Sequence, residues 1–449
     1  MSRSSGLRVV VGCPFLLIGV LGLGVPAEAQ DGAPASGPSA SAPEIAQADT
    51  TTQIDELRRR VEILAAEVEK LRSGEPEAIE VPEERRRALG LAPSAAATYR
   101  RSTQGVSLAG YGEALLENFA NENEAGAAGA PTTKFDFLRA ILYAGYRFSD
   151  KFLFNSEIEI EHANEISVEF AYVDYLVNNN LTLRAGMLLL PLGLVNEFHE
   201  PTVFTGAKRP ETEQRVLPTT WRENGAGLLG TVGPVSFRAY AVNGLNAAGF
   251  NATGIRGGRQ KGANARAAHM AFAGRVDVAP IPGVFGGVGL YHGGSGQEAV
   301  VLNGERLDVG TTIAEVHGQA QWRGIDLRAL FATASVDQAG PASTALRLAP
   351  GAGVAEEMQG GYVQLGYNVL SQRQTSVAVT PYVRFETVDT QHQVPTGFIR
   401  DLSRDGTFKT LGVEVKPISH VVLKTDYQWI ANMAGTGRNQ FNINLGYAF

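Results

Sequence analysis

The feature that most constrains this chain is a two-residue alternation of apolar and polar side chains, which recurs from Val106 to Phe449. It is clearest in the last ten residues, where one face carries Phe441, Ile443, Leu445, Tyr447 and Phe449, and the other carries Gln440, Asn442, Asn444, Gly446 and Ala448. Successive side chains of a β-strand point to opposite faces, so the pattern predicts strands with one apolar and one polar face.

The apolar faces require an apolar environment. No stretch after residue 29 holds eighteen uninterrupted apolar residues, so we predict no membrane-spanning helix. A closed barrel is the remaining way to cross lipid, because it leaves no backbone group unpaired. The final aromatic, Phe449, is similar to the terminal signal by which outer-membrane barrels are recognised for assembly.

Turn-forming residues divide this region into strands. Seven short turns alternate with eight mostly longer connections, which predicts sixteen strands with both termini on the periplasmic side. We therefore expect an all-β fold, a 16-stranded antiparallel transmembrane β-barrel over 103–449, preceded by a short N-terminal coiled-coil helix. Weak segments near Trp221 and Gly286 leave fourteen or eighteen strands as alternatives.

The first residues have the composition of a secretory signal. Arg3 and Arg8 precede an apolar run over 9–25, and Ala27-Glu28-Ala29 forms a cleavage site, so 1–29 is predicted to be a signal peptide. Residues 30–50 are rich in Ala, Ser and Pro and are predicted to be a flexible linker. Cys13, the only cysteine, lies within the signal, so the mature chain has no disulfide.

A heptad pattern follows over 51–73. Its apolar positions alternate three and four residues apart at Ile54, Leu57, Val61, Leu64, Val68 and Leu71. This predicts a coiled-coil helix too short to hold an oligomer by itself, with a lone amphipathic helix as the alternative. Residues 74–102 are charged and then Ala-rich, which predicts a linker, or a plug-like segment, leading into the barrel.

Motifs for chemistry are incomplete. Gly225 to Gly230 match a dinucleotide-binding pattern by letter, but no helix pattern follows. His199-Glu200 begins a zinc-protease string, yet Val203 stands where the second histidine belongs. We therefore predict no enzyme, no cofactor and no metal site, and the net charge of −7 argues against nucleic-acid binding. A hydrolase using paired carboxylates such as Glu157 and Glu159 is the least favoured alternative.

The polar faces of the strands supply candidate pore residues. Inward-facing cations are predicted at Arg184, Arg238, Arg275, Arg328, Arg384, Lys416 and Lys424. An acidic strip is predicted at Glu157, Glu159, Glu161 and Glu169. The long connection 190–220 is expected to fold inward as a constriction loop that carries Glu197, His199, Glu200, Lys208, Arg209 and Arg215. The luminal cations predict that anions permeate more readily than cations. The alternative is that the luminal charges merely pair with one another.

From about Phe135 to Val242 the chain resembles the phosphate-selective porin family. The similarity is carried by Phe154 to Ala163, Glu169 to Tyr175, Arg184 to Met187 with Pro191-Leu192-Gly193, and Glu197 to Pro201. The resemblance implies a sixteen-stranded trimeric porin whose third loop lines the constriction. Family members use ladders of luminal arginines and lysines for phosphate, whereas the acidic strip here departs from that pattern.

These observations lead to an expected function. We expect a homotrimeric porin of the Gram-negative outer membrane, in contact with its lipid, that lets small ions and hydrophilic solutes diffuse passively with a mild anion preference. Its N-terminal segment is expected in the periplasm. The alternative is a structural tether that links the envelope, through the coiled coil, to the cell wall.

Overall fold

The computed structural model describes residues 59–62, 80–129 and 133–449, which fall into two compact units, 1–71 and 72–449. In the first unit, residues 59–62 are helical. The predicted signal peptide and the 30–50 linker lie outside the described residues, as does the predicted coiled coil except for 59–62. No helix among the described residues is long and apolar enough to cross a membrane.

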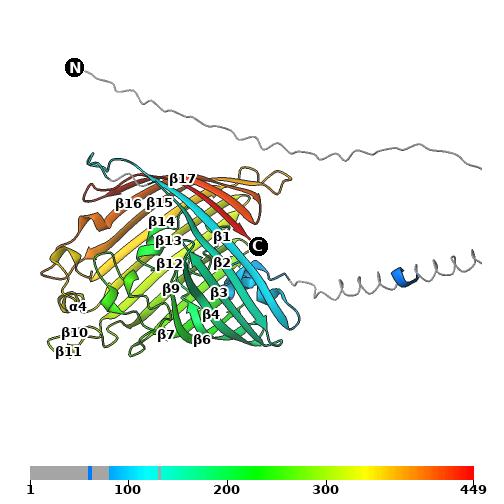
Figure 1. Ribbon diagram of the computed structural model, residues 1–449, viewed down its shortest axis with the longest axis horizontal. Coiled ribbons are helices and arrows are strands. Elements are labelled where there is room, and N and C mark those ends of the chain that lie inside the picture. The colour runs from blue at the N-terminus through cyan, green and yellow to red at the C-terminus, as the bar shows by residue number, and fades with distance from the viewer. Residues whose placement is uncertain (1–58, 63–79, 130–132) are drawn as a thin grey trace, which may run out of the picture. The chain divides into compact units, whose positions relative to one another are not determined.

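In the second unit, sixteen antiparallel strands form one closed barrel (Figure 1). The strands are β1 (Gly105–Phe119), β2 (Thr133–Arg147), β3 (Phe152–Glu161), β4 (Glu165–Asn178), β5 (Leu181–Leu189), β6 (Arg222–Val232), β7 (Val235–Asn243), β8 (Met270–Ile281), β9 (Val284–Gly294), β12 (Gly310–Trp322), β13 (Ile325–Val336), β14 (Glu357–Tyr367), β15 (Ala378–Gln393), β16 (Asp405–Ile418), β17 (Val421–Asn432) and β18 (Gln440–Ala448). Each strand pairs with its neighbours, and β1 closes the barrel on β18 with Tyr111 opposite Ala448. The predicted sixteen-stranded barrel is therefore confirmed.

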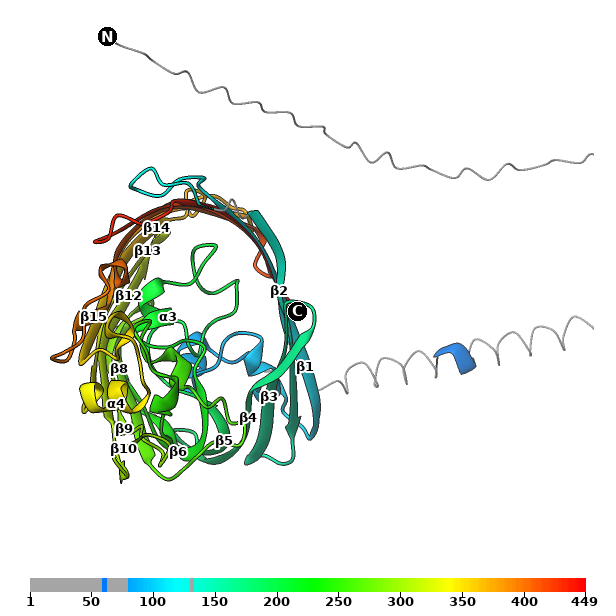
Figure 2. The same cartoon turned by 60° about the vertical axis from the view of Figure 1, so that its left-hand side comes forward.

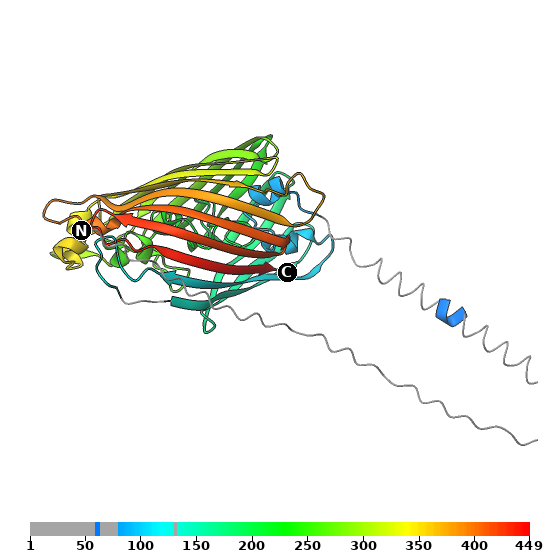
Figure 3. The ribbon, with the colours of Figure 1, turned by 90° about the horizontal axis from the view of Figure 1, so that it is seen from above.

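Short elements lie in the connections. The helices are α2 (Glu83–Ala88), α3 (Glu211–Arg215), α4 (Ala339–Ala345), η1 (Ala95–Arg100), η2 (Ala247–Gly249), η3 (Arg256–Gly258), η4 (Pro350–Ala352) and η5 (Leu402–Arg404). A small hairpin is made by β10 (Val301–Leu302) and β11 (Glu305–Arg306). In Figure 3, α4 lies at one end of the barrel and the C-terminus at the other.

The alternation in sequence becomes two faces of one sheet. On β18, Phe441, Leu445 and Tyr447 are exposed on the outer face, while Asn442 and Asn444 are fully buried on the inner face. The outer face repeats this pattern around the barrel with exposed leucine, valine and phenylalanine side chains. An outside made of such residues suits hydrocarbon, and a polar inside suits water.

All seven predicted short turns lie between consecutive strands at one end, here called the turn end. At two of them, Gly233 and Gly324 have φ values of +58° and +89°, a conformation that glycine adopts without steric cost. The longer connections lie at the opposite, loop end. One of these, predicted over 245–264, extends further, because β8 begins only at Met270.

Of the two alternatives predicted for 74–102, a linker or a plug-like segment, the residues from 80 onward agree with the plug-like segment. Residues 80–104, here called the N-terminal segment, include α2 and η1, and η1 packs inside the barrel against β1, β2 and β3. Leu91, Ala92 and Ala96 are buried there. The small alanine side chains let the backbone of this segment approach the inner wall, where the side-chain amide of Asn155 on β3 donates to the carbonyl oxygen of Ala95 (2.8 Å).

Candidate functional site

The constriction loop, residues 190–220, lies inside the barrel, where Figure 2 shows its helix α3 within the ring of strands. Its two ends are joined by Asn196. The side-chain amide of Asn196 donates to the carbonyl oxygens of Leu190 (2.7 Å) and Trp221 (2.9 Å) and accepts from the Trp221 amide (2.7 Å). Trp221 is fully buried and its ring lies 4.7 Å from that of Tyr291. The base of the loop is thus closed and fixed to the wall.

Five of the predicted luminal cations hold the path of this loop. Each donates a hydrogen bond to a main-chain carbonyl oxygen of the loop: Arg275 to Gly193, Lys416 to Thr202 (2.9 Å), Arg328 to Val203 (3.2 Å), Lys424 to Phe204 (2.7 Å) and Arg384 to Lys208 (3.3 Å). They come from β8, β16, β13, β17 and β15, so the loop is gripped around much of the barrel. The cations therefore position the loop in addition to charging the lumen.

The other two predicted cations are closely paired. Arg238 is 1% exposed and contacts Glu197 of the loop (2.5 Å) and Asp277 (2.7 Å). Arg184 makes a two-point contact with Asp174 (2.8 and 2.9 Å) and lies 3.9 Å from the ring centroid of Tyr172. The positive charges of these two arginines are therefore neutralised by the neighbouring carboxylates.

Carboxylates of the barrel wall also hold the loop. In these contacts the loop donates the hydrogen bond and the wall accepts it. Asp426 accepts from the amide of Ala207 (2.8 Å), and Glu386 accepts from that of Thr212 (2.5 Å). Within the loop, Glu213 accepts from the Val195 amide and from the hydroxyl of Tyr362 on β14. Burial raises the pKa of Glu213 to about 7.

The predicted acidic strip meets the loop at His199. The Nε2 atom of His199 lies 3.1 Å from Glu157 and 3.0 Å from Glu169, and Nδ1 lies 2.8 Å from the carbonyl oxygen of Asn196. Burial alone would lower the pKa of His199, but the two carboxylates outweigh it and raise the pKa to about 10. Glu159 contacts Arg139 (3.3 Å). Only Glu161 of the strip stays half-exposed.

The remaining predicted loop residues have separate partners. Glu200 accepts from the amide and hydroxyl of Ser94 in the N-terminal segment, and burial raises its pKa to about 7. The other three pairs are Lys208 with Glu117 (3.0 Å), Arg209 with the Thr220 hydroxyl (3.1 Å), and Arg215 with Glu211 (2.6 Å). The loop and the N-terminal segment thus occupy the lumen together.

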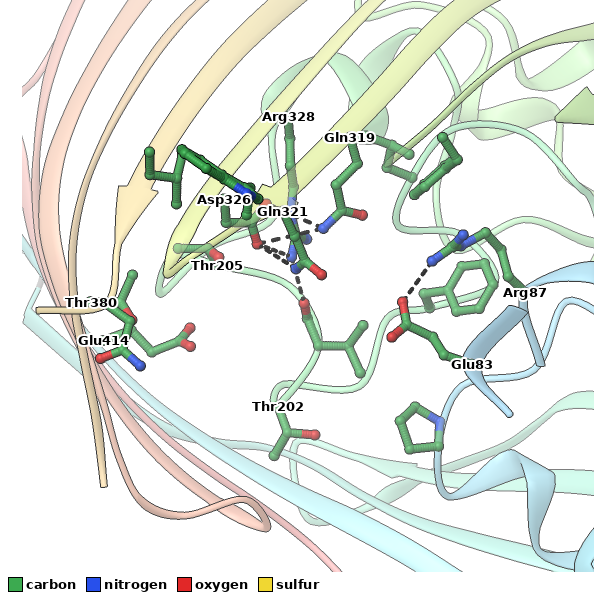
Figure 4. A pocket seen from close by; sticks show the side chains of 18 of the residues that line it. Glu83, Arg87, Thr202, Thr205, Gln319, Gln321, Asp326, Arg328, Thr380 and Glu414 are labelled. Atoms are coloured by element: carbon green, nitrogen blue, oxygen red, sulfur yellow. Dashed lines mark hydrogen bonds and ion pairs between the residues drawn. The ribbon is translucent and has the colours of Figure 1, made fainter. Parts of the chain in front are cut away.

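A cavity of about 550 Å³ lies between the loop, α2 and the wall at the turn end (Figure 4). Its charged lining comprises the cations Arg86, Arg87, Arg275, Arg323, Arg328 and Lys416 and the carboxylates Glu83, Asp326 and Glu414. Part of this charge is paired, as Arg328 is with Asp326 (2.8 Å) and Arg87 with Glu83 (2.6 Å). Six cations against three carboxylates leave the cavity positive.

A second cavity of about 530 Å³ opens at the loop end. It is lined by equal numbers of opposite charges: Glu159, Glu161, Glu165 and Glu169 against Arg222, Arg256, Arg259 and Lys261. Burial, with the neighbouring Arg256 and Arg222, lowers the pKa of Arg259 to about 9. The positive and negative side chains at this end of the lumen are therefore equal in number.

Sequence analysis missed several of these groups. Arg86 and Arg87 lie in the segment taken for a linker, although the run Arg85-Arg86-Arg87 was visible as a cationic cluster. Arg222 follows the weak segment near Trp221, and Arg256 and Arg259 come from a connection whose sequence carries no strand pattern. No feature of the sequence around Tyr99 indicated that its hydroxyl would contact Asp174.

No protein-family model matches the sequence, so the resemblance to the phosphate-selective porin family remains a prediction. An uncharacterized protein of Aquifex aeolicus (strain VF5) is 35% identical over 366 residues, which cover 78% of this chain and 81% of that protein.

Two solved structures have a similar barrel. One is OmpT with loop L8 deleted, an outer-membrane protein of Vibrio cholerae (TM-score 0.50, 12% identity, 77% of this chain and 99% of that one). The other is an anion-selective porin from Comamonas acidovorans (TM-score 0.50, 12% identity, 77% and 100%). The chain belongs to the same family as the Aquifex aeolicus protein and has the sixteen-stranded barrel fold of outer-membrane porins.

Proposed function

We propose that the chain is an outer-membrane channel through which small hydrophilic solutes diffuse passively, with a mild preference for anions. The observation that carries the proposal is the closed barrel itself, apolar outside and polar inside. A barrel of sixteen strands is wide enough to enclose water once its side chains are placed. Passage of this kind makes and breaks no bond, so the proposal includes no enzymatic activity and no cofactor.

The constriction loop supports a size filter. It is held by cations from five strands and by the amide contacts of Asp426 and Glu386, so it presents a fixed obstacle within the lumen. A loop anchored by main-chain contacts on many sides keeps one shape as solutes pass. We infer that the cutoff is set by the space that the loop leaves beside the wall.

The anion preference rests on the turn-end cavity. Because Arg275 is paired with Asp277 (2.8 Å) and Lys416 with Glu414 (2.9 Å), the excess positive charge rests on Arg86 and Arg323, in a narrow space bounded by protein where charged side chains bias permeation. The loop-end cavity carries no net charge and adds no such bias. Because most luminal cations are paired, we expect a mild preference instead of strict phosphate selectivity.

The setting follows from the fold and the resemblance. The apolar outer face of the barrel suits lipid. On that face and on the resemblance to the phosphate-selective porin family we base the proposal that the protein is a homotrimer in the outer membrane. The turn end would then face the periplasm, as would the N-terminal residues. The periplasmic coiled coil and a tethering role belong to residues that the structure does not describe.

A reversal-potential measurement tests the channel and its preference together. The full-length protein is inserted into planar bilayers with a salt gradient, and we expect discrete channels whose reversal potential favours anions. Replacing Arg86 and Arg323 with Gln should shift the potential towards cations, because both line the positive cavity and neither is one of the cations that hold the constriction loop. The matched control is Arg306→Gln, a charge exposed on β11 at the loop end. Folded protein that forms no channels would overturn the proposal.

A further inference from the structure

Three side chains converge where the constriction loop meets β3 and β4. His199 comes from the loop, Glu157 from β3 and Glu169 from β4, and each offers one donor atom within 4.8 Å of the others. All three are at most 2% exposed. They are brought together only by folding, since His199 lies 42 residues beyond Glu157 in the sequence.

The hydrogen bond at Nδ1 fixes the state of the His199 ring. The partner of Nδ1 is the carbonyl oxygen of Asn196 at 2.8 Å, and a carbonyl oxygen can only accept, so Nδ1 carries a hydrogen. In a neutral ring, Nε2 then presents its lone pair to two carboxylates. Two negative groups facing a lone pair repel it, so a cation must stand at Nε2, either a proton or a metal ion. Metal-binding histidines commonly donate their other ring nitrogen to a carbonyl oxygen in this way.

A single proton does not complete the cluster. It can point at only one carboxylate, and only the contact with Glu157 has hydrogen-bond geometry. Among the described residues, Oε2 of Glu157 and the hydroxyl of Tyr111 are buried without a hydrogen-bond partner, and Oε2 of Glu169 has only its 3.0 Å ion-pair contact with Nε2 of His199. The Tyr111 ring lies edge-on to His199, 6.3 Å between centroids, and its hydroxyl lies within electrostatic range of both carboxylates. Buried oxygens left without partners are costly, and a bound cation would satisfy them.

The arginines around the three side chains do not neutralise all of the nearby carboxylates. Arg139 contacts Glu113 and Glu159, and Arg222 contacts Glu169. Within the described part of the chain, Glu157 has no ion-pair partner except His199. When His199 is neutral, as a metal ligand must be, four carboxylates face two guanidinium groups in this network, and one divalent cation balances their charge.

We propose that His199, Glu157 and Glu169 form a binding site for one divalent transition-metal ion of the Zn²⁺ type. Imidazole nitrogen with carboxylate oxygen suits Zn²⁺ and its neighbours, whereas Ca²⁺ and Mg²⁺ prefer oxygen alone. With metal–ligand bonds of about 2.0–2.2 Å, the ligand atoms of one tetrahedral ion lie about 3.3–3.6 Å apart. The separations of 3.1 and 3.0 Å from Nε2 are a few tenths of an ångström shorter, so a small outward shift of the carboxylates would admit the ion. We expect water to complete the shell, with the hydroxyl of Tyr111, unpartnered in the part of the chain that the structure describes, as its hydrogen-bond partner.

Such an ion would tie the constriction loop to the wall. It joins the loop to β3 and β4, on the side of the barrel opposite the carbonyl contact of Arg328 on β13. The inference does not depend on the solute that the channel carries, because binding is measured without transport.

Metal retention tests the site. The full-length protein in detergent is stripped with a chelator, titrated with Zn²⁺ and dialysed against metal-free buffer, and the retained metal is counted by mass spectrometry. We expect one equivalent per chain. His199→Gln and Glu157→Gln should each weaken binding by at least about 100-fold, since loss of a second-shell contact alone costs roughly 10–100-fold. The matched control is His317→Gln, a buried luminal histidine whose two carboxylates face opposite ring nitrogens.

Each outcome decides the inference. Retention by the wild type and the control with loss in the two variants supports the site, provided that heat-modifiable gel mobility shows all four proteins folded. Equal retention in all four proteins, or none in the wild type, means an imidazolium bridge only and overturns it. Should the variants fail to fold, Co²⁺ in the wild type decides: visible d–d bands at one equivalent, abolished by Zn²⁺, support the site, and their absence overturns it.

Discussion

The ammonium group of Lys424 lies 2.7 Å from the carbonyl oxygen of Phe204 and 3.8 Å from the centroid of the same residue's ring. One fully buried cation on β17 therefore holds both the backbone and the side chain of a single residue at the inner bend of the constriction loop. A cation expected to attract solutes is instead shielded from them by the loop that it binds.

Replacing Lys424 with Met should loosen the loop. The change keeps most of the side-chain stem but removes a charge-assisted hydrogen bond, which is worth about 1.5–3 kcal/mol. We expect larger and noisier single-channel currents. Lys409→Met is the control, because Lys409 lies on the neighbouring strand β16 with its side chain exposed on the outer face. Currents identical to those of the wild type would show that Lys424 does not position the loop.

Replacing Arg184 with Met should destabilise the barrel. Asp174 is fully buried, and without its two-point partner its charge is uncompensated, which costs about 3–5 kcal/mol. Chemical denaturation of the protein in detergent measures the loss. Adding Asp174→Asn to the same protein should recover most of it, and failure of the double variant to recover stability would contradict the pairing.

The stability of the docked loop should fall as the pH rises through about 7. Burial raises the pKa of Glu213 from 4.5 to about 7, so the folded state favours the protonated carboxyl. The stabilisation is complete below pH 4.5 and is lost as the pH passes 7, at most about 3 kcal/mol. Glu213→Gln should therefore flatten the pH dependence of thermal unfolding between pH 5 and pH 8. An unchanged slope would assign that dependence to other groups.

Replacing Gly90 with Ala should displace the N-terminal segment. Gly90 has a φ of +64°, and a Cβ there would collide with the carboxylate of Glu197, the partner of Arg238. Gly304→Ala is the control, since its φ of +86° imposes similar strain, about 1–2 kcal/mol, with open space around the new Cβ. We expect faster proteolysis within 80–104 in the Gly90 variant alone. Equal cleavage of both variants would mean that the collision is harmless.

The strands could be predicted from the sequence because their signal is local. The two-residue period on β18 and on β3 is visible residue by residue, and turn residues mark where strands meet at Gly233 and Gly324. Each strand of a barrel pairs with its sequence neighbours, so the count of strands gave the topology without any long-range inference.

The contacts of the site could not be predicted in the same way. Lys424 binds a main-chain carbonyl oxygen 220 residues away in the sequence. Because every residue type carries such an oxygen, no pattern of side chains could have predicted this contact. A metal site that can be recognised from sequence at His199 would have its second histidine at helical spacing, whereas the two glutamates beside His199 come from β3 and β4. Alanine-rich sequence before the barrel matches a tether and a close-packed insert equally well.

The wall grips the loop through its main-chain carbonyl oxygens at Thr202, Val203, Phe204 and Lys208. Substitution at these positions leaves the carbonyl oxygens in place, although at Phe204 and Lys208 it also removes a side-chain contact with the wall, to Lys424 and Glu117 respectively. Evolution, or an engineer, can therefore exchange side chains on this stretch and alter what passes through the barrel without redesigning the wall that supports it.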